Sequence, residues 1–396
     1  MRIVVYGGSG TTGRLIAREL RRRGADVVLA GRDAARLEAA ADALDDARIA
    51  VAPVDDPIAL ATVCEGASVI VGSAGPFGPV GEPLLEAAIA SGAHYLDIAG
   101  EQAFLRAMYE RHEAEARHAG VCAISGLGFE VTLGDLAAGW AAAALAGAAG
   151  GDRDRADGGD DAADPVRATD APTIAVDDPL DEVAVTYALD DFVPTPGTQL
   201  STIASLAEDG VVWQRERWDP VPPAAEQRRI NAGPARGGER DAVSFPSGEV
   251  ITVPRHVAAR RIQTYVSPSR SGWAARAARL AAPILPLVGR TGVAAWLARQ
   301  IDPRPPDDDA RARAGFTVIA QARRRFDQTQ VAVSGHDVYR VTATIVGWAA
   351  LALARRDRGP VGVLAPSEAF APRAALRALA AEADLAVTTS FGTRWP

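Results

Sequence analysis

Residues 3–32 read IVVYGGSGTTGRLIARELRRRGADVVLAGR, and this stretch decides the fold. A short β-branched run leads into a turn that holds Gly7, Gly10 and Gly13, and a helical apolar pattern and a second apolar run follow. Strand, glycine-rich turn, helix and strand in this order are typical of a dinucleotide-binding unit. The glycines let the backbone approach a pyrophosphate, which free N–H groups at the helix N-terminus bind. An ordinary glycine-rich turn is the alternative, but it leaves the flanking strands unexplained.

The end of the second strand predicts which dinucleotide binds. This strand ends in Gly31-Arg32, with no acid among its last four residues. An acid there would accept hydrogen bonds from a ribose 2′-hydroxyl, whereas a guanidinium pairs with a 2′-phosphate. The predicted cofactor is therefore NADP(H).

Composition limits the class of protein. A chain of 396 residues has room for two domains, and a net charge of −8 argues against a nucleic-acid binder. Every one of the 42 basic residues is an arginine, so no lysine is available for Schiff-base chemistry. Cys64 and Cys122 show no metal-ligand spacing, and we expect buried free thiols, no metal site and a cytoplasmic location. The N-terminus begins directly with a core strand and so predicts no signal peptide, and the apolar stretch 273–298 is too interrupted by proline and arginine to span a membrane.

The first half of the chain continues to alternate between strands and helices. Expected strands are 48–52, 68–73, 94–98 and 121–125; expected helices are 57–65, 82–91, 102–118 and one that carries Asp135. This alternation predicts an α/β domain, a doubly wound parallel sheet over residues 1–148. The loop 74–78 would lie beyond the strand ends, where such sheets bind ligands.

The second half has a different character. Residues 149–172 are acidic and rich in glycine and alanine, and we expect a flexible surface segment. Residues 173–396 then form an α+β domain with a mixed or antiparallel sheet, a substrate or dimerisation domain whose C-terminal segment could pack back on the first domain. Its expected elements are strands at 182–189, 250–253, 261–266, 314–324, 330–334 and 385–388, a helix entered at 194–198, a segment at 338–353 that begins extended and becomes helical, and a loop and helix at 365–383.

Several motifs together resemble the saccharopine dehydrogenase-like oxidoreductase family, including its trans-acting enoyl reductase branch. The matching pieces are GGSGTTG (7–13), AGR (30–32), AGPFGPVGEPLLEAAIASGAHYLDIAGE (74–101), GLGFEVTLGDL (126–136), PTPGTQLSTIASL (194–206), FPSGEVITVPRH (245–256) and GVLAPSEAFAP (362–372). The likeness covers nearly the whole chain apart from the acidic segment. Family members often show GFD followed shortly by proline, where this chain has Gly128-Phe129-Glu130 and Leu133.

The resemblance implies a Rossmann domain and an α+β domain that covers the nicotinamide. By that resemblance Arg32 would hold the 2′-phosphate, and Ala74, Gly75 and Pro76 would lie along the nicotinamide ribose. The pyrophosphate would be held by Gly7, Ser9, Gly10, Thr11 and Thr12. Gly13, Asp55 and Phe77 complete the candidate cofactor site.

Hydride transfer usually needs a proton donor, and several side chains are candidates. Glu101, just past a strand end, could bind substrate, accept a proton or serve as a helix N-terminal acid. Tyr95 and Asp97 share one face of their strand and could act in the cleft or form a buried pair. His256 is the best-placed imidazole for donating a proton, with a core or surface role as the alternative. Asp135 is expected to have a structural role. Thr198 and Ser201 could bind a carboxylate or thioester oxygen, or they could cap a helix.

The function expected from these features is NADPH-dependent reduction of a C=C bond conjugated to a carbonyl in an apolar or acyl-linked small molecule. Reduction of an imine or oxo group in an amino-acid-derived substrate is the alternative, because the family resemblance covers both. A third possibility is an NADP(H)-binding sensor that has lost turnover. A homodimer through the second domain is also expected.

Overall fold

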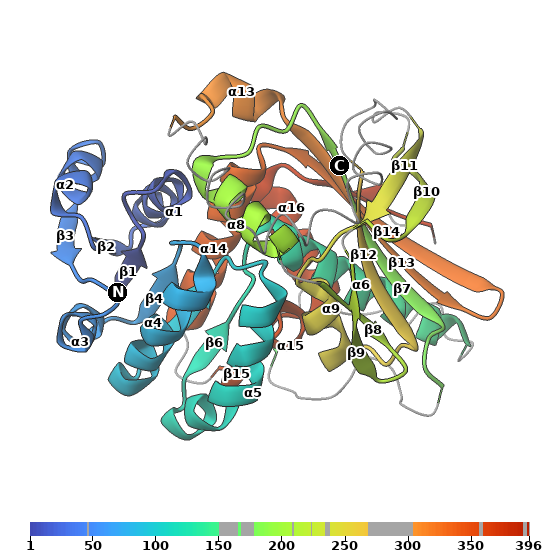
Figure 1. The fold of residues 1–396 in the computed structure, drawn as a ribbon, viewed down its shortest axis with the longest axis horizontal. Helices are drawn as coiled ribbons and strands as arrows, with labels where there is room; N and C mark the ends of the chain where they lie inside the picture. Colours follow the sequence, from blue (N-terminus) through green and yellow to red (C-terminus); the bar gives the residue numbers. More distant parts are fainter. Residues whose placement is uncertain are drawn as a thin grey trace.

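The computed structural model describes residues 1–45, 47–149, 165–167, 178–207, 210–222, 224–233, 238–267, 304–355, 359–390 and 394–395. Their elements form two sheets with helices packed between and around them (Figure 1). Most of the acidic segment 149–172 and all of the apolar stretch 273–298 lie outside the described residues, so the expectations for them stay predictions.

The first sheet is parallel, and the described part of the chain gives it seven strands. In spatial order they are β15 (Gly362–Leu364), β6 (Cys122–Ile124), β5 (His94–Asp97), β4 (Val69–Gly72), β1 (Arg2–Tyr6), β2 (Asp26–Gly31) and β3 (Arg48–Val51). β1 and β4 are almost entirely buried, as expected for central strands covered on both faces. The expected doubly wound sheet is therefore confirmed.

Helices cover both faces of this sheet. They are α1 (Thr11–Arg22), α2 (Ala34–Asp42), α3 (Pro57–Cys64), α4 (Phe77–Ser91) and α5 (Gln102–Ala119). Local signals fix several of their ends: Asp56 accepts hydrogen bonds from the N–H groups of Ile58 and Ala59 at the start of α3, with Pro57 in its first turn. α4 and α5 end at Gly92 and Gly120, both in the left-handed conformation that glycine tolerates.

The second sheet is mixed. In spatial order its main path is β10 (Gln227–Asn231), β11 (Glu239–Ser244), β12 (Arg261–Ser267), β7 (Glu182–Asp190), β13 (Gly315–Arg324), β14 (Asp327–His336), β16 (Ala386–Thr389) and β17 (Arg394–Trp395), and β8 (Gly210–Gln214) and β9 (Arg217–Val221) attach to β12. β12 and β7 are parallel, whereas the other pairs are antiparallel. The expected α+β second domain is confirmed.

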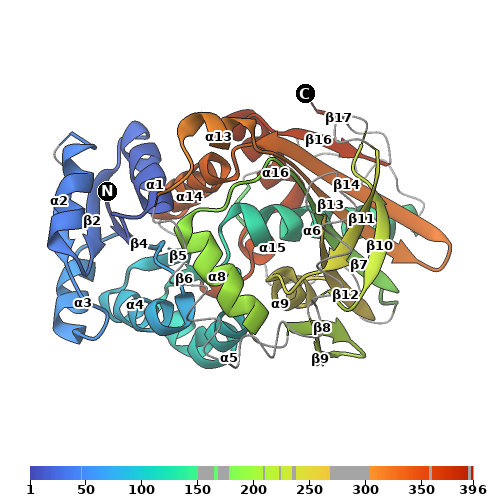
Figure 2. The same ribbon diagram turned by 45° about the horizontal axis from the view of Figure 1, so that its top comes forward.

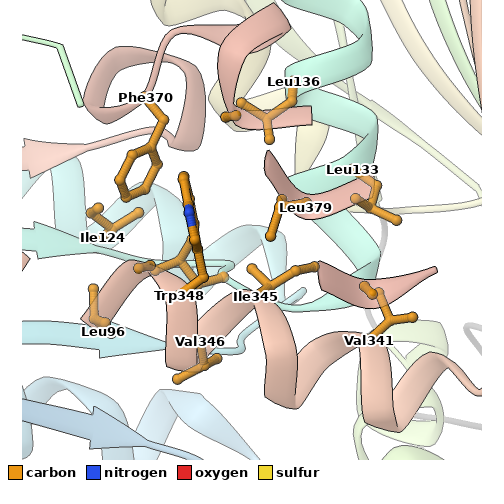
Figure 3. Close-up of a cluster of buried hydrophobic side chains, with 14 of the residues drawn as sticks. Leu96, Ile124, Leu133, Leu136, Val341, Ile345, Val346, Trp348, Phe370 and Leu379 are labelled. Atoms are coloured by element: carbon orange, nitrogen blue, oxygen red, sulfur yellow. The ribbon is translucent and has the colours of Figure 1, made fainter. Parts of the chain in front are cut away.

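Two long helices join the sheets into one core. α6 (Phe129–Ala149) packs against β13 and β14, while α14 (Val338–Ala354) packs against α1 on the first sheet (Figure 2). Figure 3 shows how side chains of the first sheet (Leu96 and Ile124), of α6 and of α14 meet around Trp348, together with Phe370 and Leu379. Among the described helices, the stretch Phe129–Gly147 is apolar and long enough to cross a membrane, but it is mostly buried in this core.

The remaining helices belong to the second half of the chain. They are α8 (Pro196–Ala207), α9 (Glu249–Thr252), the 3₁₀ turn η2 (Val253–Arg255), α13 (Asp308–Arg313), α15 (Pro366–Ala369) and α16 (Pro372–Ala383). β15 and α15 return to the first domain, where β15 forms its edge strand beside β6.

Three expected elements differ from the structure. The predicted strand at 250–253 is wrong, because these residues form α9 and begin η2; a short buried apolar run is typical of either state. α4 begins at Phe77, five residues before the expected start, with Pro83 inside it. The segment 338–353 is helical from its first residue, because Asp337 caps the N–H of Arg340.

The two thiols lie where they were expected. Cys64 and Cys122 are free and buried. Burial raises the pKa of Cys64 to about 11, so this thiol stays protonated and unreactive near neutral pH.

Candidate functional site

The candidate site begins at the switch point of the first sheet. β1 and β4 are neighbours, and the chain order runs outward from them in opposite directions. Their C-terminal loops meet there: a Cβ on Gly7 would lie 2.8 Å from the backbone nitrogen of Ala74. Doubly wound sheets bind ligands in the crevice at this point.

The glycine-rich loop forms a cradle that only glycine permits. Gly7 has φ +83°, and a Cβ on Gly13 would collide with the carbonyl oxygen of Gly7. α1 starts at Thr11 after Gly10, which offers no side-chain cap, so the first N–H groups of the helix are left for a ligand. Ser9, Thr11 and Thr12 are half-buried around this cradle. The loop therefore fits the pyrophosphate of a dinucleotide, with the N-terminus of α1 facing its charge.

Arg32 lies at the end of β2, next to the cradle. Its side chain is exposed and makes no ion pair within the residues that the structure describes. Burial raises the pKa of Tyr6, while the charges of Arg32 and Asp55 act on it in opposite directions, so both side chains lie near this phenol. The Tyr6 hydroxyl donates to the carbonyl of Ala52 at 2.8 Å and fixes the strand ends. This geometry leaves the Arg32 guanidinium available to a 2′-phosphate.

The loop after β4 is tied to the start of α5. Ala74, Gly75 and Pro76 follow β4, and the Gly75–Pro76 peptide is cis. Phe77 opens α4, is buried, and packs on Phe104 with ring centroids 5.9 Å apart. Phe77 also lines part of the cleft described next, so its ring holds the loop in place and borders the cavity.

Two adjoining cavities form a cleft between the two sheets. One has a volume of about 150 Å³ and the other about 300 Å³. Both are lined by the same six residues, which come from α1, from the loops after β5 and β11, and from α6 and α8: Thr12, Ile98, Glu130, Thr198, Thr202 and Phe245. Because Thr12 belongs to the cradle, the cleft is continuous with the nucleotide site.

The larger cavity is mainly apolar. Its wall includes the side chains Phe129, Tyr187, Leu189, Phe192, Val266, Val338 and Tyr339. The smaller cavity adds Ser201 and the carboxylate of Glu101. Neither cavity has an arginine among the described residues that line it. An anionic substrate group would therefore meet no arginine among the described lining residues.

Glu101 and Thr198 are held by specific partners. Glu101 accepts hydrogen bonds from the N–H groups of Phe77 and Gly78, and from the Ser201 hydroxyl at 3.1 Å. Thr198 bonds to the Tyr339 hydroxyl at 3.1 Å. The structure thus brings both polar residues to the cleft, as the sequence led us to expect for a substrate-binding surface.

Glu130 lines both cavities, although the sequence did not single it out as a candidate site residue. The next residue, Val131, has φ +65° and ψ −65°, a strained conformation for a β-branched residue. The N–H of Val131 is held by the Tyr187 hydroxyl at 3.0 Å. Burial, together with the charge of Glu101, raises the pKa of Glu130. The GFE motif was the available signal, but sequence could not show which way the acid points.

Tyr95 is buried inside the first sheet and does not line the cleft. Its hydroxyl lies 3.5 Å from the carbonyl of Gly81. Asp97 is also fully buried, and burial raises its pKa to about 6, although the Ser125 hydroxyl and two backbone N–H groups donate to it. The structure therefore contradicts a catalytic role for Tyr95 and supports the buried-pair interpretation.

His256 also lies away from the cleft. It is 1% exposed, and its Nε2 is 2.9 Å from Oδ2 of Asp135. Asp135 further accepts a hydrogen bond from the N–H of Ser367 at 2.8 Å, which ties α6 to α15. The expectation that His256 reaches the substrate is wrong, because η2 directs it into the core. The structural role expected for Asp135 is confirmed.

Comparison with known proteins identifies the first domain. Residues 3–124 match the model of the saccharopine dehydrogenase NADP-binding domain. The first domain is therefore similar to the nucleotide-binding domain of that family. The match supports binding of NADP(H) at the level of the domain, in agreement with Arg32 and the cradle.

Curated relatives resemble the same part of the chain. A trans-acting enoyl reductase of Mycobacterium ulcerans is 33% identical over 140 residues, which are 34% of this chain and 34% of that protein. A human saccharopine dehydrogenase-like oxidoreductase is 31% identical over 152 residues, 34% of this chain and 35% of that one. The chain thus matches about a third of the length of these relatives.

A solved structure resembles the whole fold. The saccharopine dehydrogenase (L-Glu forming) of Saccharomyces cerevisiae superposes over 100% of both chains with a TM-score of 0.58 and 14% sequence identity. At this identity the likeness shows the fold alone.

Proposed function

We propose that this chain is an NADPH-dependent reductase of a C=C bond conjugated to a carbonyl, in an apolar, acyl-type substrate. The observation that carries the proposal is the 300 Å³ cavity, which is lined mainly by aromatic and aliphatic side chains and adjoins the nucleotide cradle. The relative named trans-acting enoyl reductase supports the same reaction class.

The residues present fit the cofactor, and each has a defined task. The cradle at Gly7–Gly13 would hold the pyrophosphate, Arg32 the 2′-phosphate, and Ala74–Pro76 the nicotinamide ribose. NADPH, when bound, supplies the hydride. The wall formed by Phe129, Phe192 and Phe245 would orient an apolar chain and exclude water from it.

Reduction of an amino-acid-derived imine or oxo compound is the alternative, and the relative named saccharopine dehydrogenase-like favours it. Such a substrate carries carboxylates, which enzymes commonly bind with arginine. The described lining of both cavities contains acids but no arginine, which argues for the apolar substrate.

NADPH oxidation followed with a panel of substrates tests the proposal. We expect turnover with a medium-chain 2-enoyl N-acetylcysteamine thioester and none with 2-oxoglutarate plus lysine. The reverse preference would favour the imine reaction. NADPH binding without turnover of any panel member would favour the sensor.

Two broader proposals accompany this function. A homodimer is proposed to form through the second sheet, which sedimentation velocity would test. A cytoplasmic location is proposed as well, and fractionation of cells that produce the protein would check it.

A further inference from the structure

Two acids beside the cleft, the half-buried Glu130 and the fully buried Glu249, share one serine hydroxyl. The Ser247 hydroxyl lies 3.0 Å from Oε1 of Glu130 and also bonds to Oε2 of Glu249. The other carboxyl oxygen of Glu249 bonds to the Tyr187 hydroxyl, which itself accepts the N–H of Val131. The result is a continuous chain of hydrogen bonds that starts at Glu130 in the cleft, passes through the buried Ser247 and Glu249, and ends at Tyr187 in the wall of the larger cavity.

Counting hydrogens shows that this chain carries an extra proton. A serine hydroxyl has one hydrogen and can donate to only one of its two carboxyl partners. If both acids were ionised, the lone pairs of the Ser247 oxygen would point at a carboxylate oxygen of one acid, with no hydrogen between the two oxygens. The two negative charges would also lie close together in a region of low exposure. One of the two carboxyl groups must therefore be protonated and donate to Ser247.

The surroundings hold the two acids in place. A Cβ on Gly100 would lie 2.9 Å from Oε1 of Glu130, and a Cβ on Gly134 would collide with the carboxyl group of Glu249. Glu249 is fully buried. Burial raises its pKa to about 7, with Glu130 acting in the same direction. The other ionisable side chains that act on the pair are Glu101, facing Glu130, and Tyr187, facing Glu249.

We propose that Glu130 and Glu249 hold one proton between them through Ser247, and that Glu130 delivers it to the substrate in the cleft. The delivery step rests on the proposed reductase function. The shared proton itself rests only on the hydrogen-bond geometry.

The proton transfer balances without a further reactant. The O–H bond of Glu130 breaks and a C–H bond forms at the carbon next to the carbonyl, whose electron pair comes from the reduced double bond. The proton that Glu130 delivers is the shared one. When it rests on Glu249 beforehand, the Glu249 hydrogen passes to Ser247 while the Ser247 hydrogen passes to Glu130, and delivery follows. After delivery both acids are carboxylates, Tyr187 donates to Glu249, Ser247 donates to one of the two acids, and solvent returns one proton through the cleft. Glu130 is then the catalytic residue, and Ser247 and Glu249 are positioning residues.

Infrared spectroscopy of the whole chain tests the shared proton without a substrate. At pH 6 the wild type should show the carbonyl stretch of a protonated carboxylic acid. The pH at which that signal disappears should be lower in both Glu130→Gln and Glu249→Gln than in the wild type, because the remaining acid no longer shares its proton with a second carboxylate. Burial raises the pKa of Asp97 to about 6, so its carboxyl group also gives such a signal. Asp97→Asn is therefore measured alongside, and the contribution of Asp97 is subtracted. Glu38→Gln, at an exposed position of α2, is the matched control and should leave the spectrum unchanged.

An unchanged midpoint of the pH titration of this signal in either glutamine variant would overturn the shared proton, as would absence of the signal from the wild type. Glu130 is half-buried at the cleft, so Glu130→Gln decides the matter if Glu249→Gln fails to fold.

Kinetics with the medium-chain 2-enoyl N-acetylcysteamine thioester tests the delivery step. Glu130→Gln should lower kcat about a hundredfold or more while leaving NADPH affinity unchanged. Glu249→Gln should move the alkaline fall of kcat to lower pH, since Glu130 then no longer shares its proton with a second carboxylate; a merely structural role would not move it. Unchanged turnover in Glu130→Gln would overturn the delivery step. Absence of turnover in the wild type, with the infrared signal present, would instead overturn the reductase function and leave the shared proton standing.

Discussion

The carboxylate of Glu101 caps a helix other than its own: its Oε2 accepts the N–H of Phe77 at 2.9 Å, at the start of α4. Glu101 immediately precedes α5, whose N–H groups its side chain does not cap. The acid thus joins the loop after β4 to the loop after β5, and the two loops form one side of the cleft.

Replacing Glu101 by Gln should reduce the free energy of unfolding by about 1 kcal/mol, because a neutral amide caps a helix N-terminus less well than a carboxylate. Urea unfolding at pH 7 measures this difference. Glu110→Gln, on the exposed face of α5, should change stability by less than about 0.5 kcal/mol. Equal stabilities of wild type and Glu101→Gln would show that the cap contributes nothing.

Arg32→Ala should lower NADPH affinity about tenfold or more and leave NADH affinity nearly unchanged. A charge-assisted contact between guanidinium and phosphate contributes roughly 1.5–3 kcal/mol, and only NADPH carries the 2′-phosphate. Fluorescence titration of each nucleotide measures both affinities. Arg18→Ala, an exposed position of α1, is the matched control and should bind as the wild type does. An equal loss of both nucleotides in Arg32→Ala would contradict the phosphate contact.

Gly13→Ala should destabilise the fold by roughly 1–3 kcal/mol and weaken both nucleotides, since the new methyl group meets the carbonyl oxygen of Gly7 inside the cradle. Thermal unfolding and nucleotide titration check the two effects separately. Gly359→Ala serves as the control, because a Cβ there has no neighbour within 4 Å. Wild-type binding by a stable Gly13→Ala protein would remove the cradle from the nucleotide site.

Asp135→Asn should cost about 1–3 kcal/mol of stability at pH 7, because it removes a buried carboxylate that is hydrogen-bonded to the His256 ring and to the N–H of Ser367. Burial alone would raise the pKa of Asp135, but the charge of His256 and its hydrogen bond hold that pKa below its usual value. A lowered pKa stabilises the fold above the unfolded-state value of about 3.9, and this contribution disappears as the pH falls through the folded-state pKa.

Urea unfolding between pH 7 and pH 3 measures this effect, and the acid-side loss should be smaller in Asp135→Asn than in the wild type. Asp42→Asn, exposed on α2, is the matched control. His256→Gln should keep wild-type kcat when folded, since His256 does not line the cleft. A folded His256→Gln protein with no turnover would restore the proton-donor role first expected for it.

The first domain could be predicted from sequence because its signals are local. Glycines at 7, 10 and 13, buried β-branched runs and helix-ending glycines at 92 and 120 each act within a few residues of chain. The strand predicted at 250–253 was wrong because local signals do not separate the two states there: a buried apolar tetrapeptide fits a helix as well as a strand. The strands β8–β11 were missed because their polar, interrupted sequence carries little period-two pattern.

The sequence by itself determined the nucleotide-binding fold and the loops that reach the switch point, and it predicts NADP(H) as the cofactor, because backbone turns and a strand-end arginine are local properties of the chain. Only the tertiary structure decided the candidate site chemistry. It buried Tyr95 and His256, and it placed Glu130, Ser247 and Glu249 in one hydrogen-bonded chain although 117 residues separate Glu130 from Ser247. The physical reason is that burial and proton sharing depend on which distant segments of the chain pack together. In addition, the strained backbone at Val131, which sets side-chain direction there, is held by a hydrogen bond from its N–H to the Tyr187 hydroxyl on β7.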